Sequence, residues 1–222
     1  MENLTLIEKE VQQHRSIAQH EKEIAQKLKS NALMEIKKSK ARENLMKIEY
    51  KLAEIKKDLA KKRNILIQEK TEIKKNQILN FSEEELKIER DYAIYNEKIA
   101  KNQKEIAEIN KKVALAEKEI AEEKVKLAKE KINVANAREK LVKNQLVYIK
   151  SVRAQVEEEK ILKAKNKAEK QKEELIKQKN EVLDADKKVK KRENKLADLK
   201  KEFSLKLAER EKIRHPGVIV AE

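Results

Sequence analysis

Several residue types are missing from the 222-residue chain or nearly so: it has no cysteine, no tryptophan, one glycine, one proline and 3% aromatic residues. Without cysteine there can be no disulfide, zinc–thiolate site or thiol nucleophile. A fold of many short elements needs glycine and proline at its turns, so this composition excludes an ordinary globular domain. The lone glycine also excludes a glycine-rich loop that cradles phosphate.

Long apolar runs are also missing. None approaches the roughly 18 consecutive apolar residues of a membrane-spanning helix. The apolar start of the chain ends before Glu8 and Glu10, which is too short for the apolar region of a signal peptide. The sequence therefore predicts a cytoplasmic protein without a transmembrane segment.

Charged side chains make up 44% of the chain, with a formal net charge of +15. The excess is spread out: residues 1–80 carry +7, residues 81–156 carry +3 and residues 157–222 carry +5. Acidic and basic residues alternate throughout, as expected for solvated helix surfaces with pairs four residues apart. The densest basic run, residues 187–192, has no aromatic side chains interleaved for base stacking. Binding to nucleic acid or an anionic membrane is therefore the weakest of three functional hypotheses.

Apolar residues follow a heptad pattern from Ile78 to Leu141. Alternate steps of three and four residues from Ile88 reach Leu141 with only Asn102, Glu123 and Glu130 as exceptions. A spacing of 3.5 residues sustained this far keeps one stripe of a helix facing a partner helix. The predicted fold class is therefore all-α, an elongated coiled coil.

The region before this pattern predicts another long helix. Thr5 and Glu8 have the spacing of a capping box, so a helix is expected over about residues 6–79. Its seam is a series of residues seven apart: Ile17, Ile24, Asn31, Lys38, Leu45, Leu52, Leu59, Leu66 and Ile73. From Leu45 to Leu59 the alternation of apolar residues is complete.

A helix start follows at residues 80–85. Ser82 is a good N-cap, Glu85 completes a capping box, and Phe81 is placed for a hydrophobic staple, with Asn80 before it. We therefore predict an antiparallel hairpin, residues 1–160, with a turn near 80–82 and a second helix over about 83–160. A kink, or a serine inside one continuous helix, is the alternative.

The two seams predict how the hairpin aligns. Opposed residues have numbers that total 161 when the turn is centred between residues 80 and 81, so that Leu52 would face Ile109. Two polar pairs would then lie in the core and set the register. They are Lys38 with Glu123 and Asn31 with Glu130.

A further seam begins at residue 161. Its members lie seven apart: Ile161, Ala168, Leu175, Val182, Val189, Leu196 and Phe203. Because the hairpin ends near residue 160, a helix over 161–214 would have no partner within the chain, and we predict that it mediates oligomerisation. A second turn near 184–186 is an alternative. Pro216 and Gly217 end the helix and leave an extended tail, residues 215–222.

Catalytic chemistry is not indicated. The three histidines, His14, His20 and His215, lack the spacing that places two ligands on one helix face, so neither a metal nor a cofactor is predicted. The leading hypothesis is a non-enzymatic structural protein, a scaffold or filament subunit that binds itself or another coiled-coil protein and no small-molecule substrate. The second hypothesis is an adaptor or stalk in a larger machine, such as a secretion or rotary assembly.

Overall fold

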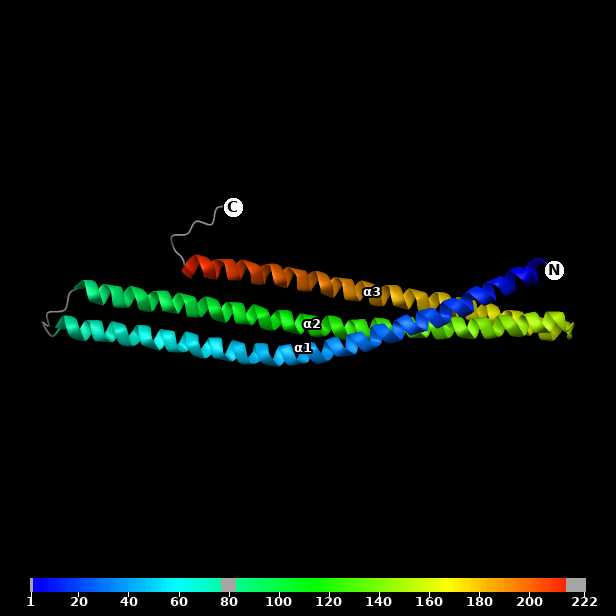
Figure 1. The fold of residues 1–222 in the computed structure, drawn as a ribbon, viewed down its shortest axis with the longest axis horizontal. Coiled ribbons are helices and arrows are strands. Elements are labelled where there is room, and N and C mark those ends of the chain that lie inside the picture. Colours follow the sequence, from blue (N-terminus) through cyan, green and yellow to red (C-terminus); the bar gives the residue numbers. More distant parts are fainter. Residues whose placement is uncertain (1, 77–82, 215–222) are drawn as a thin grey trace. The chain divides into compact units, whose positions relative to one another are not determined.

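The computed structural model describes the backbone of residues 2–76 and 83–214, and the side chains of residues 4–73 and 87–214. It contains three helices: α1 (Glu2–Asn76), α2 (Glu83–Arg153) and α3 (Glu158–Arg214) (Figure 1). No strand occurs among the described residues, so the all-α prediction is confirmed. The predicted turn residues Asn80, Phe81 and Ser82 and the tail 215–222 lie outside the described residues, and Glu85 lies in the first turn of α2.

The second helix is shorter than predicted, because α2 ends at Arg153 rather than near residue 160. Gln155 has a φ of 49°, in the left-handed region. The Val156 amide donates to the Ser151 carbonyl and the Gln155 amide to that of Val152. These two bonds form a Schellman motif, which stops a helix by turning one residue left-handed. Gln155 stands where glycine is usual, so the sequence carries no signal for this stop.

Helix α3 starts immediately after this turn. The Glu157 carbonyl accepts hydrogen bonds from the amides of Lys160 and Ile161. Glu158 and Glu159 in the first turn place negative charge at the positive end of the helix dipole. The helix then continues without a break to Arg214, so the alternative of a second turn near 184–186 is wrong.

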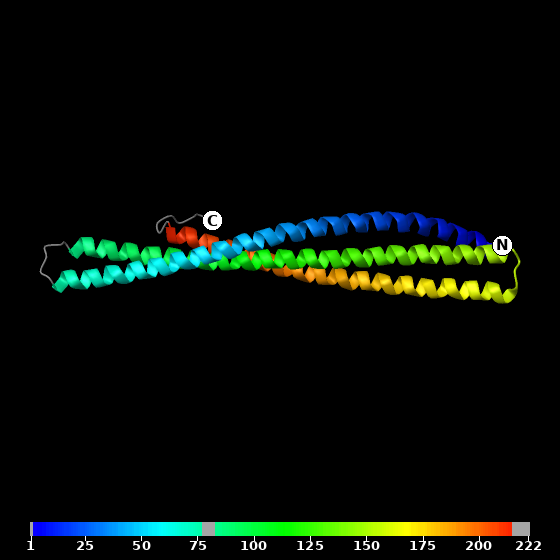
Figure 2. The same cartoon turned by 90° about the horizontal axis from the view of Figure 1, so that it is seen from below.

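Contacts within the chain define two compact units. Unit 1 contains Met1–Lys37 and Lys118–Glu193, and unit 2 contains Lys38–Glu117 and Asn194–Glu222. Each unit therefore holds one segment of every helix, and the division does not follow the predicted boundary at residue 160. In each unit the α2 segment lies beside segments of both α1 and α3 (Figures 1 and 2).

The predicted antiparallel hairpin is confirmed in each unit. In unit 1 the Lys22 ammonium lies 3.0 Å from the Glu139 carboxylate. In unit 2 the Asn64 amide donates to the Glu97 carboxylate at 2.8 Å. The residue numbers of these two pairs total 161, whereas those of Arg42 with Glu117 total 159 and those of Lys104 with Glu54 total 158. The helices α1 and α2 therefore run antiparallel.

The faces that meet in this hairpin differ from the prediction. A series of buried residues on α1 lies one position beyond the expected seam, and four of its eight members are alanine. Its members lie seven residues apart, except that residue 60 is skipped: Val11, Ala18, Ala25, Ala32, Ser39, Met46, Ala53 and Ile67. Glu43, outside this series, is also buried. On α2 a matching buried series consists of Ala93, Ala100, Ala107, Ala114, Ala121, Ala128 and Ala135. Small side chains let two helix backbones approach closely, so alanine builds this interface in place of leucine and isoleucine.

The leucine and isoleucine seam of α2 contacts α3 instead of α1. In unit 1, Leu175 of α3 is 4% exposed and forms an apolar cluster with Val134, Ala137 and Leu141 of α2, against which Val182 also packs. In unit 2 the Lys206 ammonium of α3 lies 2.9 Å from the Glu105 carboxylate of α2. The heptad seam predicted for residues 161–203 is therefore real, but its partner is α2. The inference that α3 has no partner within the chain is wrong.

None of the described helices contains an 18-residue stretch apolar enough to cross a membrane.

Candidate interaction surface

Helix α1 carries a row of large aliphatic side chains that the described residues of unit 2 leave at least half exposed. We call this row the α1 stripe. Its residues, 50–66% exposed, are Leu45, Ile48, Leu52, Ile55, Leu59, Leu66 and Ile73. They were predicted to be the core of the hairpin, and that prediction is wrong. For example, Leu52 is 50% exposed, whereas Ile109, its expected partner, is 4% exposed.

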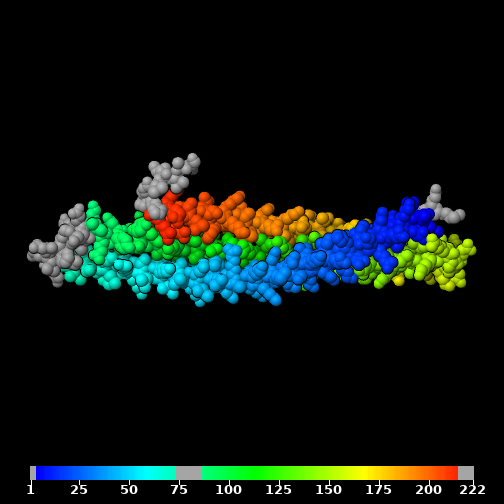
Figure 3. Space-filling model, viewed as in Figure 1, coloured from blue at the N-terminus to red at the C-terminus, as the bar shows by residue number. Residues whose placement is uncertain are grey.

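Helix geometry explains why the α1 stripe stays exposed. Each residue turns the helix by about 100°, so the residue after a stripe position points well to one side of it. Met46 and Ala53, which directly follow Leu45 and Leu52, are buried at 8% and 7% exposure. These following residues face α2, so the stripe faces away from it. Figure 3 shows the cyan surface of α1 uncovered along one edge.

The predicted register pairs lie on the surface or have other partners. Asn31 and Lys38 are exposed, so neither is a core residue, and that prediction is wrong. The Glu123 carboxylate lies 3.0 Å from the Lys126 ammonium and 3.7 Å from the Arg192 guanidinium. Glu130 accepts a hydrogen bond from the Asn133 amide at 3.1 Å.

Polar contacts flank the alanine interface in both units. In unit 2 the Lys104 ammonium lies 2.8 Å from the Glu54 carboxylate. Lys104 and Lys111 also lie over the Tyr50 ring, 5.6 and 5.1 Å from its centroid. The hydrogen bond from Lys104 lowers the pKa of the Glu54 carboxyl. In these contacts the α1 residues, Tyr50 and Glu54, point toward α2. The charged side chains beside the α1 stripe take no part in them.

A buried arginine links α1 and α2 in unit 1. The Arg138 side chain, 7% exposed, donates to both carboxylate oxygens of Glu21 at 3.0 and 2.8 Å. Its guanidinium also lies 3.0 Å from His14 Nδ1. Burial, with the positive charge of Arg138, lowers the pKa of His14. Arg138 and Glu21 therefore satisfy each other's charge in a contact that joins α1 to α2.

A shallow groove lies between the helices of unit 1. Its volume is about 460 Å³, and α1, α2 and α3 all contribute to its walls. Its lining is mostly aliphatic: Ile24, Val134, Val182 and Leu183, with Glu21, Lys131 and Lys179. Among the residues that the structure describes, no cluster of histidine and carboxylate side chains could hold a metal ion.

Asn102 is the one polar interruption of the α2 seam that the structure buries fully. It is 4% exposed, and neither its amide nitrogen nor its amide oxygen has a hydrogen-bond partner among the described residues. A polar side chain in a helix–helix seam favours one register at a cost in stability. The sequence pattern marks Asn102 correctly as a core position, but the core is shared with α3.

Comparisons with protein-family models, with curated proteins and with solved structures find no match to this chain.

Proposed function

We propose that this chain is a non-enzymatic structural protein that associates with another helix through the α1 stripe and acts as a scaffold subunit. The observation that carries the proposal is the exposure of seven large aliphatic side chains at heptad spacing on one helix. Scattered exposed apolar residues are normal, whereas a contiguous apolar patch marks an interaction site. Heptad spacing adds that the partner is a helix.

The energetics favour association. Fully burying a leucine or isoleucine side chain contributes about 1.5–3 kcal/mol. The stripe residues are 50–66% exposed, so completing their burial contributes roughly 1–2 kcal/mol each and roughly 7–14 kcal/mol for the seven. Association itself costs about 4–15 kcal/mol. A partner with a comparable apolar stripe doubles the gain, which leaves a surplus for binding.

The leucine and isoleucine seams of α2 and α3 pack against each other, as the cluster around Leu175 and Leu141 shows. Other large apolar side chains of α3, Leu162, Ile176, Leu183 and Leu205, are 54–72% exposed but do not form a heptad row as long as the α1 stripe. The basic excess is divided among many short ion pairs, of which Lys206 with Glu105 and Glu209 is an example. The adaptor hypothesis differs from self-association only in the identity of the helix bound, and one experiment distinguishes the two.

The test is the molar mass of the full-length protein, measured by light scattering over a range of concentrations. We expect the wild-type chain to self-associate and the double variant Leu52→Asn/Leu59→Asn to be monomeric. The control is Lys61→Asn, an exposed residue of α1 outside the stripe, which should behave like wild type. Circular dichroism at 222 nm confirms that each variant is folded.

Two results would contradict the proposal. If the wild-type chain stays monomeric up to its solubility limit, it does not self-associate, and the adaptor hypothesis is favoured. A double variant that associates as strongly as wild type shows that the surface lies elsewhere.

A further inference from the structure

Resting on the proposed function, we propose that the partner of the α1 stripe is the α1 stripe of a second copy, antiparallel to the first and related to it by a two-fold axis between Ala53 and Glu54. In this arrangement facing residues have numbers that total 107. The paired layers used in this argument span residues 38–69, all within unit 2. The argument rests on the exposed apolar positions and on the charges beside them.

The apolar layers match around the axis. Leu52 faces Ile55 of the second copy, and Ile48 faces Leu59 of the second copy, each twice by symmetry. These four residues are 50–66% exposed in the single chain. They form the uninterrupted part of the heptad pattern, so the longest stretch without a polar residue lies at the centre of the interface. A hydrophobic centre with a polar rim is the usual construction of a protein interface.

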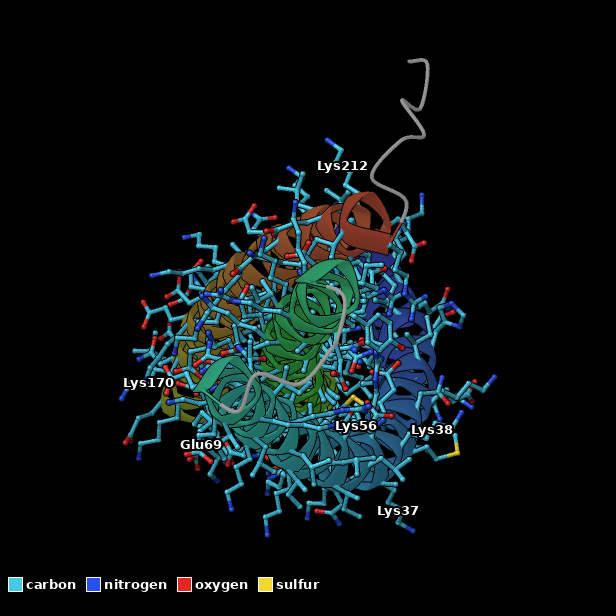
Figure 4. The ribbon with its side chains drawn as sticks, turned by 90° about the vertical axis from the view of Figure 1, so that its left-hand side faces the viewer. Lys37, Lys38, Lys56, Glu69, Lys170 and Lys212 are labelled. Atoms are coloured by element: carbon cyan, nitrogen blue, oxygen red, sulfur yellow. The ribbon has the colours of Figure 1, made fainter. Side chains whose placement is uncertain are left out.

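Polar interruptions of the α1 stripe also find partners. Lys38 and Glu69 occupy seam positions at opposite ends of the interface, and both are exposed at the periphery of the helices seen end-on (Figure 4). In the antiparallel pair Lys38 faces Glu69 of the second copy. The only mismatched layer in residues 38–69 joins Lys62 to Leu45, where the lysine can extend its ammonium group to solvent.

Charges beside the seam are complementary as well. Antiparallel helices bring equivalent flanking positions together, which places Lys51 beside Asp58 of the second copy and Glu49 beside Lys56. None of these four side chains, and neither Lys38 nor Glu69, forms an ion pair with a described residue of its own chain. The available ion pairs of α1 in unit 2 point instead to α2, as between Arg42 and Glu117 at 2.6 Å.

Other alignments place like charges together. A shift by one heptad to a total of 114 brings Asp58 against Asp58 and Lys56 against Lys56. A shift in the other direction, to 100, brings Lys51 against Lys51 and Glu49 against Glu49. A parallel pair in register sets Lys51 beside Lys56. The total of 107 is disfavoured only by Arg42 beside Arg63, and Arg42 is already bound to Glu117. Repulsion against the alternatives is how helix pairs select one partner and register.

Symmetry then limits the size of the assembly. Both copies use the same surface, so the interface is isologous and closes on itself. The α1 stripe therefore makes a dimer, and the dimer is the unit from which any larger scaffold is built.

The test is a charge exchange in the full-length protein. Lys38→Glu sets one glutamate against Glu69 at each end of the interface, and Glu69→Lys sets one lysine against Lys38 at each end. We expect each single variant to weaken the dimer about tenfold or more, measured by sedimentation equilibrium. The double variant Lys38→Glu/Glu69→Lys restores opposite charges and should return the dissociation constant close to wild type. The two residues lie 31 positions apart on one helix, so restoration must come from contact between copies.

A cysteine test reports the register directly, because the natural chain has no cysteine. In an equimolar mixture of the Ile48→Cys and Leu59→Cys proteins, oxidation should link position 48 of one copy to position 59 of the other. Links of 48 to 48 would show a parallel pair and overturn the inference. A charge exchange that fails to restore binding would also overturn the inference. In either case, the proposed function would still hold if the wild-type chain dimerises and Leu52→Asn/Leu59→Asn disrupts the dimer. A monomeric wild type would remove both.

Discussion

Substitutions at two neighbouring residues of α1 test whether its interface with α2 is the observed alanine series or the leucine and isoleucine seam predicted from the heptads. Ala25 is 0% exposed and lies in the interface with α2, whereas Ile24, a residue of the expected seam, is 48% exposed. We compare Ala25→Leu with Ile24→Ala. Both residues lie in unit 1, outside the proposed dimer interface, so dimerisation does not complicate the measurement.

The magnitudes follow from the exposures. Extra methylene groups in a closely packed core cost about 1–3 kcal/mol, so Ala25→Leu should lower the free energy of unfolding by that amount or more. Ile24 buries about half of its side chain, and full burial contributes about 1.5–3 kcal/mol, so its truncation loses roughly 0.8–1.5 kcal/mol. Alanine recovers a few tenths of a kcal/mol through its higher helix propensity. The net cost of Ile24→Ala should be below about 1.5 kcal/mol.

Urea unfolding followed at 222 nm measures both changes, and an unchanged slope shows that the denatured state is unaffected. The variant with the lower free energy of unfolding shows which of the two residues lies in the core. If Ile24 were a core residue, its truncation to alanine would cost about 2–5 kcal/mol. A variant Ile24→Ala that is less stable than Ala25→Leu would therefore refute the alanine interface.

Two further predictions concern residues that the heptads do not explain. Burial and Arg138 lower the pKa of His14, so the unfolded chain binds the His14 proton more tightly than the folded one, and stability falls as the pH drops below about 6.5. Urea midpoints at pH 7.5 and 5.5 should differ more for wild type than for His14→Gln; an equal difference would show that His14 is not the cause. Gln155→Gly should raise the melting temperature, because glycine adopts a positive φ without the cost of a Cβ atom, and relief of about 1 kcal/mol is expected. Ala154→Gly is its control, and a rise of the same size there would show that the left-handed residue is not the cause.

The proposed dimer follows from an unequal distribution of apolar faces among the three helices. Helix α2 has two, the alanine series beside α1 and the leucine and isoleucine seam beside α3. Helix α3 has one heptad seam, which packs against α2. Helix α1 also has two faces, its alanine series and the α1 stripe, and among the described residues only the alanine series is covered. The stripe is therefore the surface on which the proposed dimer is built.

Much of this architecture is encoded locally. The near absence of glycine and proline, together with the heptad spacing, predicts long helices, and the capping signal around Ser82 predicts a helix start close to Glu83, where α2 begins. Antiparallel alignment follows from the position of the turn, because a short connection leaves two long helices few registers. The α3 seam through Leu175 and Val189 was likewise readable, since every member lies at the same heptad position.

The pairing of faces was decided by tertiary structure. Heptad spacing shows which residues of a helix lie on one side, but not which helix will cover them. Two seams, those of α1 and α3, compete for the single leucine and isoleucine seam of α2. The turn at Gln155, which no glycine or proline announces, brings α3 back to that seam. Alanine then supplies the α1 interface through close approach of the backbones, a contribution that side-chain hydrophobicity alone does not reveal. As a result, the stripe through Leu52 and Leu59 is left on the outside of the fold.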